Sequence, residues 1–212
     1  MKVAKYIILI IVIVVIGYNS VYFRKLDEVK ASLTAKEFNA AQYAQTFWTN
    51  KLEPNLNKAI DIIQLTNMFS SNADKTFKTY SHALGIGNLR YFLVKGKGTI
   101  TAINEDDITV LLQSDTSKQT ITLATEYIFG NAVRDATGLI NINEFNNTMD
   151  FNNVSAELNK IIRAKVLPSL KQKARKGSEI EFTGAIELNK EHLDLSNIEV
   201  IPVTVTLFTI DH

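Results

Sequence analysis

Residues 89–125, LRYFLVKGKGTITAINEDDITVLLQSDTSKQTITLAT, contain three segments in which apolar residues recur at about every second position. This period is typical of strands that bury one face, and short polar turns separate the segments. The stretch therefore predicts three consecutive strands, at 89–103, 108–113 and 119–125. Gly96 and Gly98 interrupt the first strand, which predicts a β-bulge or a sharp coil in a long strand.

The residues after this stretch complete a chain order. Residues 154–175 carry apolar side chains on one helical face, and Gly177 ends that helix. Two segments with strand character follow, at 178–187 and 193–205. We therefore expect an α+β fold with a five-stranded OB-like β-barrel and a long helix between strands 3 and 4. A β-sandwich would lack this helix, and a doubly wound α/β fold would need strands that alternate with helices.

The predicted barrel helix has two further features. Asn152 or Asn153 can cap its start, and Pro168 should kink it. Its second half contains basic residues and no acid, with cations at Lys160, Arg163, Lys165, Lys171, Lys173, Arg175 and Lys176. We expect these cations to line a solvent-exposed face and to complement the helix dipole, in preference to contacting anionic lipid or a nucleic-acid strand.

The region before the first strand reads as helical. Residues 33–69 carry an apolar stripe at three- to four-residue spacing, which predicts one long helix or two. Pro54 interrupts the stripe and predicts a kink or a new first turn. Trp48 lies on the stripe, so we expect a core residue in preference to a platform on which a ligand stacks. A further short helix is predicted at 73–84.

The N-terminus has the features of a membrane anchor. Residues 6–16 are unbroken apolar, the residues that follow extend the run, and Lys2 and Lys5 precede it. A helix of roughly 18 residues spans about 27 Å, close to the hydrocarbon thickness of a bilayer. We expect residues 1–25 to be an uncleaved transmembrane signal anchor, single-pass in the inner (cytoplasmic) membrane, with the C-terminal domain extracytoplasmic.

These patterns divide the chain into three expected parts. Residues 1–25 form the anchor, residues 26–88 form a helical segment packed on the barrel, and residues 89–212 form the OB-like barrel. Residues 126–151 are then an insertion between the third strand and the barrel helix.

Composition excludes several functions. The chain of 212 residues has 23 Lys and Arg against 22 Asp and Glu, which leaves no broad cationic surface for a nucleic acid. It contains no cysteine, so a thiolate metal site and a cysteine nucleophile are excluded. His82, His192 and His212 match no metal-binding spacing. We expect no catalytic residues, no metal, no cofactor and no enzyme activity.

The segment 130–159 holds the candidate ligand-binding residues. Arg134 and Asp135 stand beside a glycine turn, and Asn147 belongs to a group of asparagines that follows them. A guanidinium with several amides could bind a sugar or a carboxylate. The same groups could satisfy the backbone of a long insertion, and we favour this scaffolding role.

The residues of this segment also carry a resemblance. Arg134-Asp135-Ala136, Phe145-Asn146-Asn147 and Leu158-Asn159 resemble the signature of the bacterial predicted periplasmic lipoproteins called domain of unknown function 2291. The resemblance implies an OB-like barrel with N-terminal helices, and genes beside sugar ABC-transporter components. Members commonly carry a lipidated cysteine, which this sequence lacks, and Thr148 stands where the family has glutamine.

We therefore expect a membrane-anchored, extracytoplasmic, non-enzymatic binding or accessory protein, associated with a sugar ABC transporter through the barrel and the insertion. The alternative is an OB-fold protein that binds an oligosaccharide or a single-stranded nucleic acid. Near-neutral charge makes nucleic acid the weaker ligand. A hydrolase that uses Asp135 finds no support in the spacing of the carboxylates.

Overall fold

The computed structural model of the protein describes residues 5, 15, 16, 18, 38–84, 87–114 and 117–208. The chain forms two compact units, Met1–Phe38 and Asn39–His212. The expected anchor at 1–25 lies outside the described residues apart from four of them. Within the described residues, no helix combines the length and the apolar character needed to cross a bilayer. The expected division at residues 25 and 88 stays a prediction.

The helical region starts at α3 (Ala40–Phe47), whose cap Asn39 accepts a hydrogen bond from the backbone N–H of Gln42. It continues as a π-helical turn (Trp48–Leu52), α4 (Glu53–Asn55) and a 3-10 turn (Leu56–Lys58). Pro54 occupies the first turn of α4, as predicted. Trp48 is 3% exposed and its Nε1 donates to Glu53 at 2.8 Å, which confirms its place in the core.

The next helix, α5 (Ile62–Tyr80), consists of two helical parts that meet at a kink, because Asn72 has non-helical backbone angles (φ −162°, ψ 95°). The side chain of Asn72 accepts from the N–H of Lys75, so the second part begins near the start of the separate helix predicted at 73–84 and ends at Tyr80. Asp61 caps the helix by accepting from the N–H of Gln64. The preceding Ile60–Asp61 forms a two-residue strand, β1, parallel to β2.

The sheet contains six strands, and five of them are long enough to have been predicted. These are β2 (Leu89–Ile103), β3 (Asp107–Gln113), β4 (Lys118–Ala124), β5 (Glu179–Asn189) and β6 (Ile198–Phe208). Their order is β1-β2-β3-β4-β6-β5, and β2 also pairs with β5. The long strands therefore pair in a closed circuit, with β1 added beside β2. The count of six differs from the expected five because a two-residue strand leaves no alternating pattern in the sequence.

Strand β2 is long and pairs with two neighbouring strands, β5 and β3. Its residues pair with β5 from Leu89 to Thr99 and with β3 from Gly98 to Ile103. A Cβ at Gly98 would lie 2.4 Å from the carbonyl oxygen of Leu111 on β3, so the close approach of the two backbones requires glycine. The register of β2 with β3 shifts between Ile100 and Ala102, so the strand contains an irregularity of the predicted β-bulge kind, placed just after the glycines.

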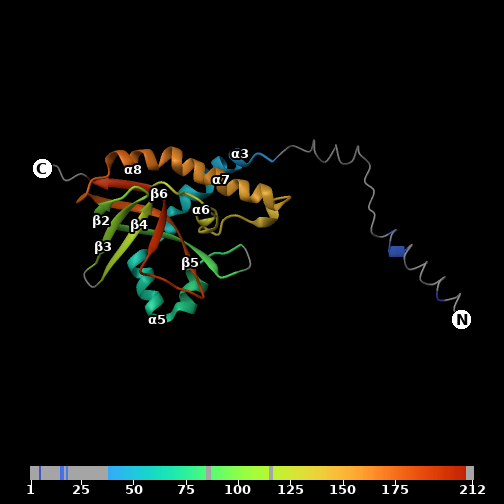
Figure 1. The fold of residues 1–212 in the computed structure, drawn as a ribbon, viewed down its shortest axis with the longest axis horizontal. Helices are drawn as coiled ribbons and strands as arrows, with labels where there is room; N and C mark the ends of the chain where they lie inside the picture. The colour runs from blue at the N-terminus through green and yellow to red at the C-terminus, as the bar shows by residue number, and fades with distance from the viewer. Residues whose placement is uncertain are drawn as a thin grey trace. The chain divides into compact units, whose positions relative to one another are not determined.

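The core fills the inside of the circuit, and helices cover it on two sides (Figure 1). The rings of Phe69 and Phe77, both on α5, lie 5.7 and 5.8 Å from the ring of Phe92 on β2. On the opposite side run α7 (Thr148–Lys165) and α8 (Leu167–Lys173), shown in orange tones in Figure 1. The shorter α6 (Ala132–Asp135) and a 3-10 turn (Ile142–Glu144) lie in the segment between β4 and α7.

The barrel helix differs from its prediction at its start. It begins at Thr148 because Asn147 accepts from the N–H of Asp150, so Asn152 and Asn153 lie inside the helix and neither caps it. The predicted kink is confirmed. The helix breaks at Val166, and Pro168 lies in the first turn of α8.

Candidate functional site

The side chains of Arg134 and Asp135 form a buried ion pair at the end of α6. Arg134 Nε donates to Asp135 Oδ1 at 2.6 Å, and Nη2 donates to Oδ2 at 3.0 Å. Both side chains are 3% exposed. This bidentate arrangement is the strong geometry for a guanidinium and a carboxylate.

The remaining nitrogen of the guanidinium is also occupied. Arg134 Nη1 donates to the backbone oxygen of Phe151 at 3.2 Å and lies 3.5 Å from Oδ1 of Asn152. The guanidinium carbon stands 3.5 Å from the centroid of the Phe151 ring. Arg134 therefore ties α6 to the first turns of α7, and its donors point into the protein.

Asn147 has a local role as well, since its Oδ1 caps α7 and its Nδ2 donates to Asp150 at 2.9 Å. The structure does not place Asn147 in hydrogen-bond contact with Arg134 or Asp135 within the described residues. A ligand role for the three residues stays a prediction. Their internal hydrogen bonds favour the scaffolding role.

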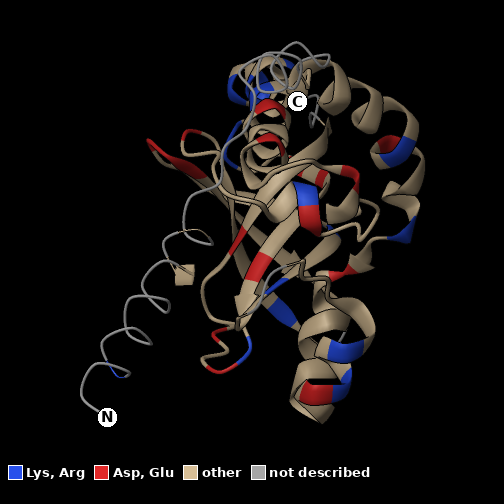
Figure 2. Ribbon diagram, turned by 90° about the vertical axis from the view of Figure 1, so that its right-hand side faces the viewer, with Lys and Arg blue, Asp and Glu red and all other residues tan. Residues whose placement is uncertain are grey.

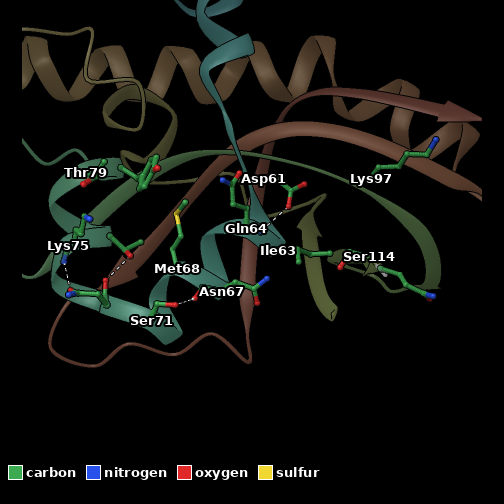
Figure 3. Close-up of a pocket in the computed structure, with 14 residues that line it drawn as sticks. Asp61, Ile63, Gln64, Asn67, Met68, Ser71, Lys75, Thr79, Lys97 and Ser114 are labelled. Atoms are coloured by element: carbon green, nitrogen blue, oxygen red, sulfur yellow. Dashed lines mark hydrogen bonds between the residues drawn. The ribbon is translucent and has the colours of Figure 1, made fainter. Parts of the chain in front are cut away.

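A large hollow lies elsewhere, between α5 and the sheet (Figure 3). We call it the α5 groove. Its volume is about 940 Å³, near the upper end of the range of about 300–1,000 Å³ found for ligand pockets. The groove is lined by Asp61, Ile63, Gln64, Asn67, Met68, Ser71, Asn72, Lys75, Thr76, Thr79, Tyr80, Lys97, Gln113 and Ser114.

The walls of the α5 groove combine apolar and hydrogen-bonding groups. Ile63 and Met68 supply apolar surface beside the side-chain amide of Asn67 (Figure 3). Within the described part of the chain, neither this amide nor the ammonium of Lys75 has a hydrogen-bond or ion-pair partner. Free amides and an ammonium around an apolar wall are typical of a site for a polar ligand.

The groove extends over the outer face of the sheet. Asp61 and Lys97 also line a second hollow of about 320 Å³ on β2, β5 and β6. Lys97 Nζ lies 3.4 Å from Glu179 and 3.5 Å from Glu181, and the charge of Glu179 is the main cause that raises the pKa of Lys97. The two hollows therefore meet at a charged point, where Lys97 stays protonated.

The α5 groove contains few groups that could support acid–base or metal chemistry. Its one carboxylate, Asp61, caps α5, and the described residues contain no cluster of His, Cys, Asp and Glu suited to a metal ion. His82 lines a different hollow of about 310 Å³, where burial lowers its pKa. The arrangement suits binding.

The residues of the α5 groove do not stand out in the sequence, because the apolar stripe is the stronger pattern in this helix. The same helix carries a second stripe, with polar residues at Gln64, Asn67, Ser71, Lys75 and Thr79. This spacing of three or four residues places Gln64, Asn67 and Ser71 on one face before the kink at Asn72, and Lys75 and Thr79 on one face after it. A helical stripe of amides and hydroxyls with one lysine is the signal that could have indicated a binding wall.

Comparison with known proteins agrees with the fold. The family model described as "Predicted periplasmic lipoprotein (DUF2291)" matches residues 11–206. The crystal structure of an OB-fold protein from Thermotoga maritima is similar, with a TM-score of 0.71 and 28% sequence identity over 82% of this chain and 100% of that chain. No curated protein matches the chain. The α+β class, the OB-like fold and the resemblance noted in the sequence are thereby confirmed.

Proposed function

The chain belongs to the family of predicted periplasmic lipoproteins called domain of unknown function 2291, and from this membership we propose that it is a membrane-anchored, extracytoplasmic protein that binds a polar ligand without catalysis. The family description indicates an extracytoplasmic location. The single observation that supports binding is the α5 groove, in which the free groups of Asn67 and Lys75 stand beside apolar surface.

An oligosaccharide is the ligand class that best fits these groups. Sugars present many hydroxyls, which amides and hydroxyls can bind as donors and as acceptors. The amides of Gln64, Asn67 and Gln113 line one hollow with the hydroxyls of Thr79 and Tyr80. OB-folds bind oligosaccharides and oligonucleotides, and a chain with a net charge of +1 is poorly suited to the second.

The anchor and the partner form the finer part of the proposal. The apolar run at 6–16 supports a single-pass anchor in the cytoplasmic membrane, with the C-terminal domain outside. A sugar ABC transporter, or its solute-binding protein, is the partner that the family resemblance implies. The protein would then hold a saccharide near the transporter, as an accessory subunit.

Binding can be tested by calorimetry on the full chain in detergent, titrated with a set of neutral oligosaccharides. We expect at least one oligosaccharide to bind, and Asn67→Ala and Lys75→Gln each to weaken it by about 5- to 10-fold, the loss of roughly one hydrogen bond. Asn57→Ala and Lys78→Gln are matched controls, because both side chains are exposed and neither lines the groove.

The outcome decides between the parts of the proposal. Absence of binding across the set, with a folded protein, would refute the oligosaccharide site. Mass spectrometry of the recovered saccharide checks the absence of catalysis, because a shortened or modified product would show an enzyme. Affinity purification from native membranes tests the partner, and a preparation free of transporter subunits would count against the association.

A further inference from the structure

The charges of this protein are distributed unevenly along the chain. Residues 158–176, in the second half of α7, in α8 and in the three residues after it, contain seven Lys and Arg and no acid. The rest of the chain keeps 16 of the 23 Lys and Arg against all 22 Asp and Glu, so it is net acidic. All seven cations of the run are exposed. The Lys and Arg segments on the helices at the top of Figure 2 belong to this basic face.

Few of these cations are neutralised by neighbours. Lys160 pairs with Glu157, and Lys171 pairs with Glu126. Within residues 38–84, 87–114 and 117–208, the other five have no carboxylate partner. The basic face therefore carries charge that is available to an anionic partner.

Two aromatic side chains lie beside this basic face. Tyr127 is 57% exposed and Phe129 is 64% exposed, and their ring centroids are 5.9 Å apart. The chain neighbours of Tyr127 contact the basic helices, because Lys171 pairs with Glu126 and Arg163 Nη1 donates to the carbonyl oxygen of Ile128 at 2.7 Å. The rings are thus flanked by the cations of α7 and α8.

Hydrogen bonds from α7 hold the aromatic segment in place. Asn159 Nδ2 donates to the carbonyl oxygen of Gly130 at 3.0 Å, and Ser155 Oγ donates to Asn131 Oδ1 at 3.0 Å. Both α7 side chains are buried. These hydrogen bonds fix a segment whose two large rings remain exposed to solvent. Exposure of apolar rings to water is unfavourable, so an exposed pair of this kind indicates an interaction site.

We propose that Tyr127, Phe129 and the cations of α7 and α8 form a docking face for a lipid surface rich in anionic headgroups. Tyrosine and other aromatic rings settle at the boundary between headgroups and acyl chains, and Lys and Arg beside them are attracted to anionic lipids. The net acidic remainder of the chain is repelled by the same surface, which fixes the orientation of the domain.

This orientation fits the rest of the molecule. The α5 helix lies on the opposite side of the sheet from α7 and α8 (Figure 1). A domain that rests on lipid through the basic face therefore keeps the α5 groove directed away from the membrane. The lipid contact does not depend on what the groove binds, so the two proposals can fail separately.

The contact can be measured with the full chain reconstituted in vesicles whose acyl chains are brominated. Phe129→Trp places a fluorophore in the aromatic pair, and Trp48, which is 3% exposed, gives a background that the unchanged chain supplies. We expect bromine to quench the added tryptophan at least 2-fold in vesicles with phosphatidylglycerol. The quenching should fall with phosphatidylcholine alone or at high salt, which screens the charges. Lys78→Trp, on α5, should stay unquenched.

Charge neutralisation supplies the second arm. Lys173→Gln, Arg175→Gln and Lys176→Gln, combined with Phe129→Trp, should reduce the quenching to the level seen with phosphatidylcholine. The control combination, Lys58→Gln, Lys95→Gln and Lys118→Gln, removes the same charge from exposed sites elsewhere and should preserve it. Unquenched Phe129→Trp on anionic vesicles would overturn the proposal and leave an acidic protein as the partner of this face. Quenching that ignores lipid charge and salt would also overturn it.

Discussion

The guanidinium carbon of Arg134 lies 3.5 Å from the centroid of the Phe151 ring, and Phe151 is the fourth residue of α7. Asp135 fixes the position of the guanidinium through two hydrogen bonds. The ion pair therefore links α6 to α7, and we expect it to stabilise the folded state.

Asp135→Asn should destabilise the protein by about 3–5 kcal/mol, because it leaves the charge of Arg134 buried and unpaired. Urea unfolding followed by circular dichroism measures this. Asp74→Asn is the control, since Asp74 is 87% exposed in its pair with Lys190 and should cost under about 1 kcal/mol. Equal effects of the two substitutions would contradict the proposed stabilising link between α6 and α7.

Asn147→Ala should cost about 0.5–2 kcal/mol, because α7 loses the side chain that caps it. Asn153→Ala, at an exposed position inside the helix, should leave the stability within about 0.5 kcal/mol. Thermal unfolding of both variants compares the two positions. A larger loss with Asn153→Ala would show that the helix starts where the sequence pattern had placed it.

Gly98→Ala should destabilise the protein by about 1–3 kcal/mol, because the new Cβ would stand 2.4 Å from the backbone oxygen of Leu111 and would force β2 and β3 apart. Gly130 gives the comparison. It has a φ of +73° and open space around a Cβ, so Gly130→Ala carries only the cost of the left-handed backbone, about 1 kcal/mol. Chemical denaturation should rank Gly98→Ala as the more harmful change.

Stability should fall as the pH drops below about 6.5, in part through His82. Burial lowers the pKa of His82, so between its folded pKa and the ordinary value of 6.5 the unfolded chain binds more protons than the folded one. The stabilising effect of neutral His82 is complete above pH 6.5 and is lost toward the lower pKa. A series of urea titrations from pH 7.5 to 5 measures the slope.

His82→Asn should flatten that slope, since the substituted side chain does not titrate. His192→Asn is the control, because His192 is exposed. An identical slope in the His82→Asn protein would remove His82 as its source. The ring of His82 packs where a Cβ of Gly138 would stand, at 2.3 Å from Nδ1, so the position also depends on Gly138 keeping its φ of +64°.

Much of the fold could be predicted because its signals are local. The alternation in 89–125 gave β2, β3 and β4 within a residue or two, and Pro54 and Pro168 marked real helix starts. The two-residue strand β1 has no such signal. The start of α7 was misplaced because several asparagines precede the helix and each is a competent cap.

The candidate site was less predictable. The sequence drew attention to Arg134 and Asp135, but their order in the chain does not reveal whether their polar atoms face a ligand or the backbone of Phe151. The α5 groove needs Lys97 from β2 and Gln113 from β3 beside the polar face of α5. No spacing along the chain predicts that these residues of β2, β3 and α5 lie together.

By itself, the sequence determined the kinds of elements, their order and the balance of charge, because periodicity, turn residues and charge are properties of short stretches. It also determined the concentration of basic residues at the end of the barrel helix. Only the tertiary structure decided that β2 pairs with both β3 and β5, that Arg134 Nη1 donates to the backbone of α7, and that Tyr127 and Phe129 stand exposed beside those cations. The physical reason is that each of these depends on contacts between residues far apart in the chain, which form when the sheet closes and the helices pack on it.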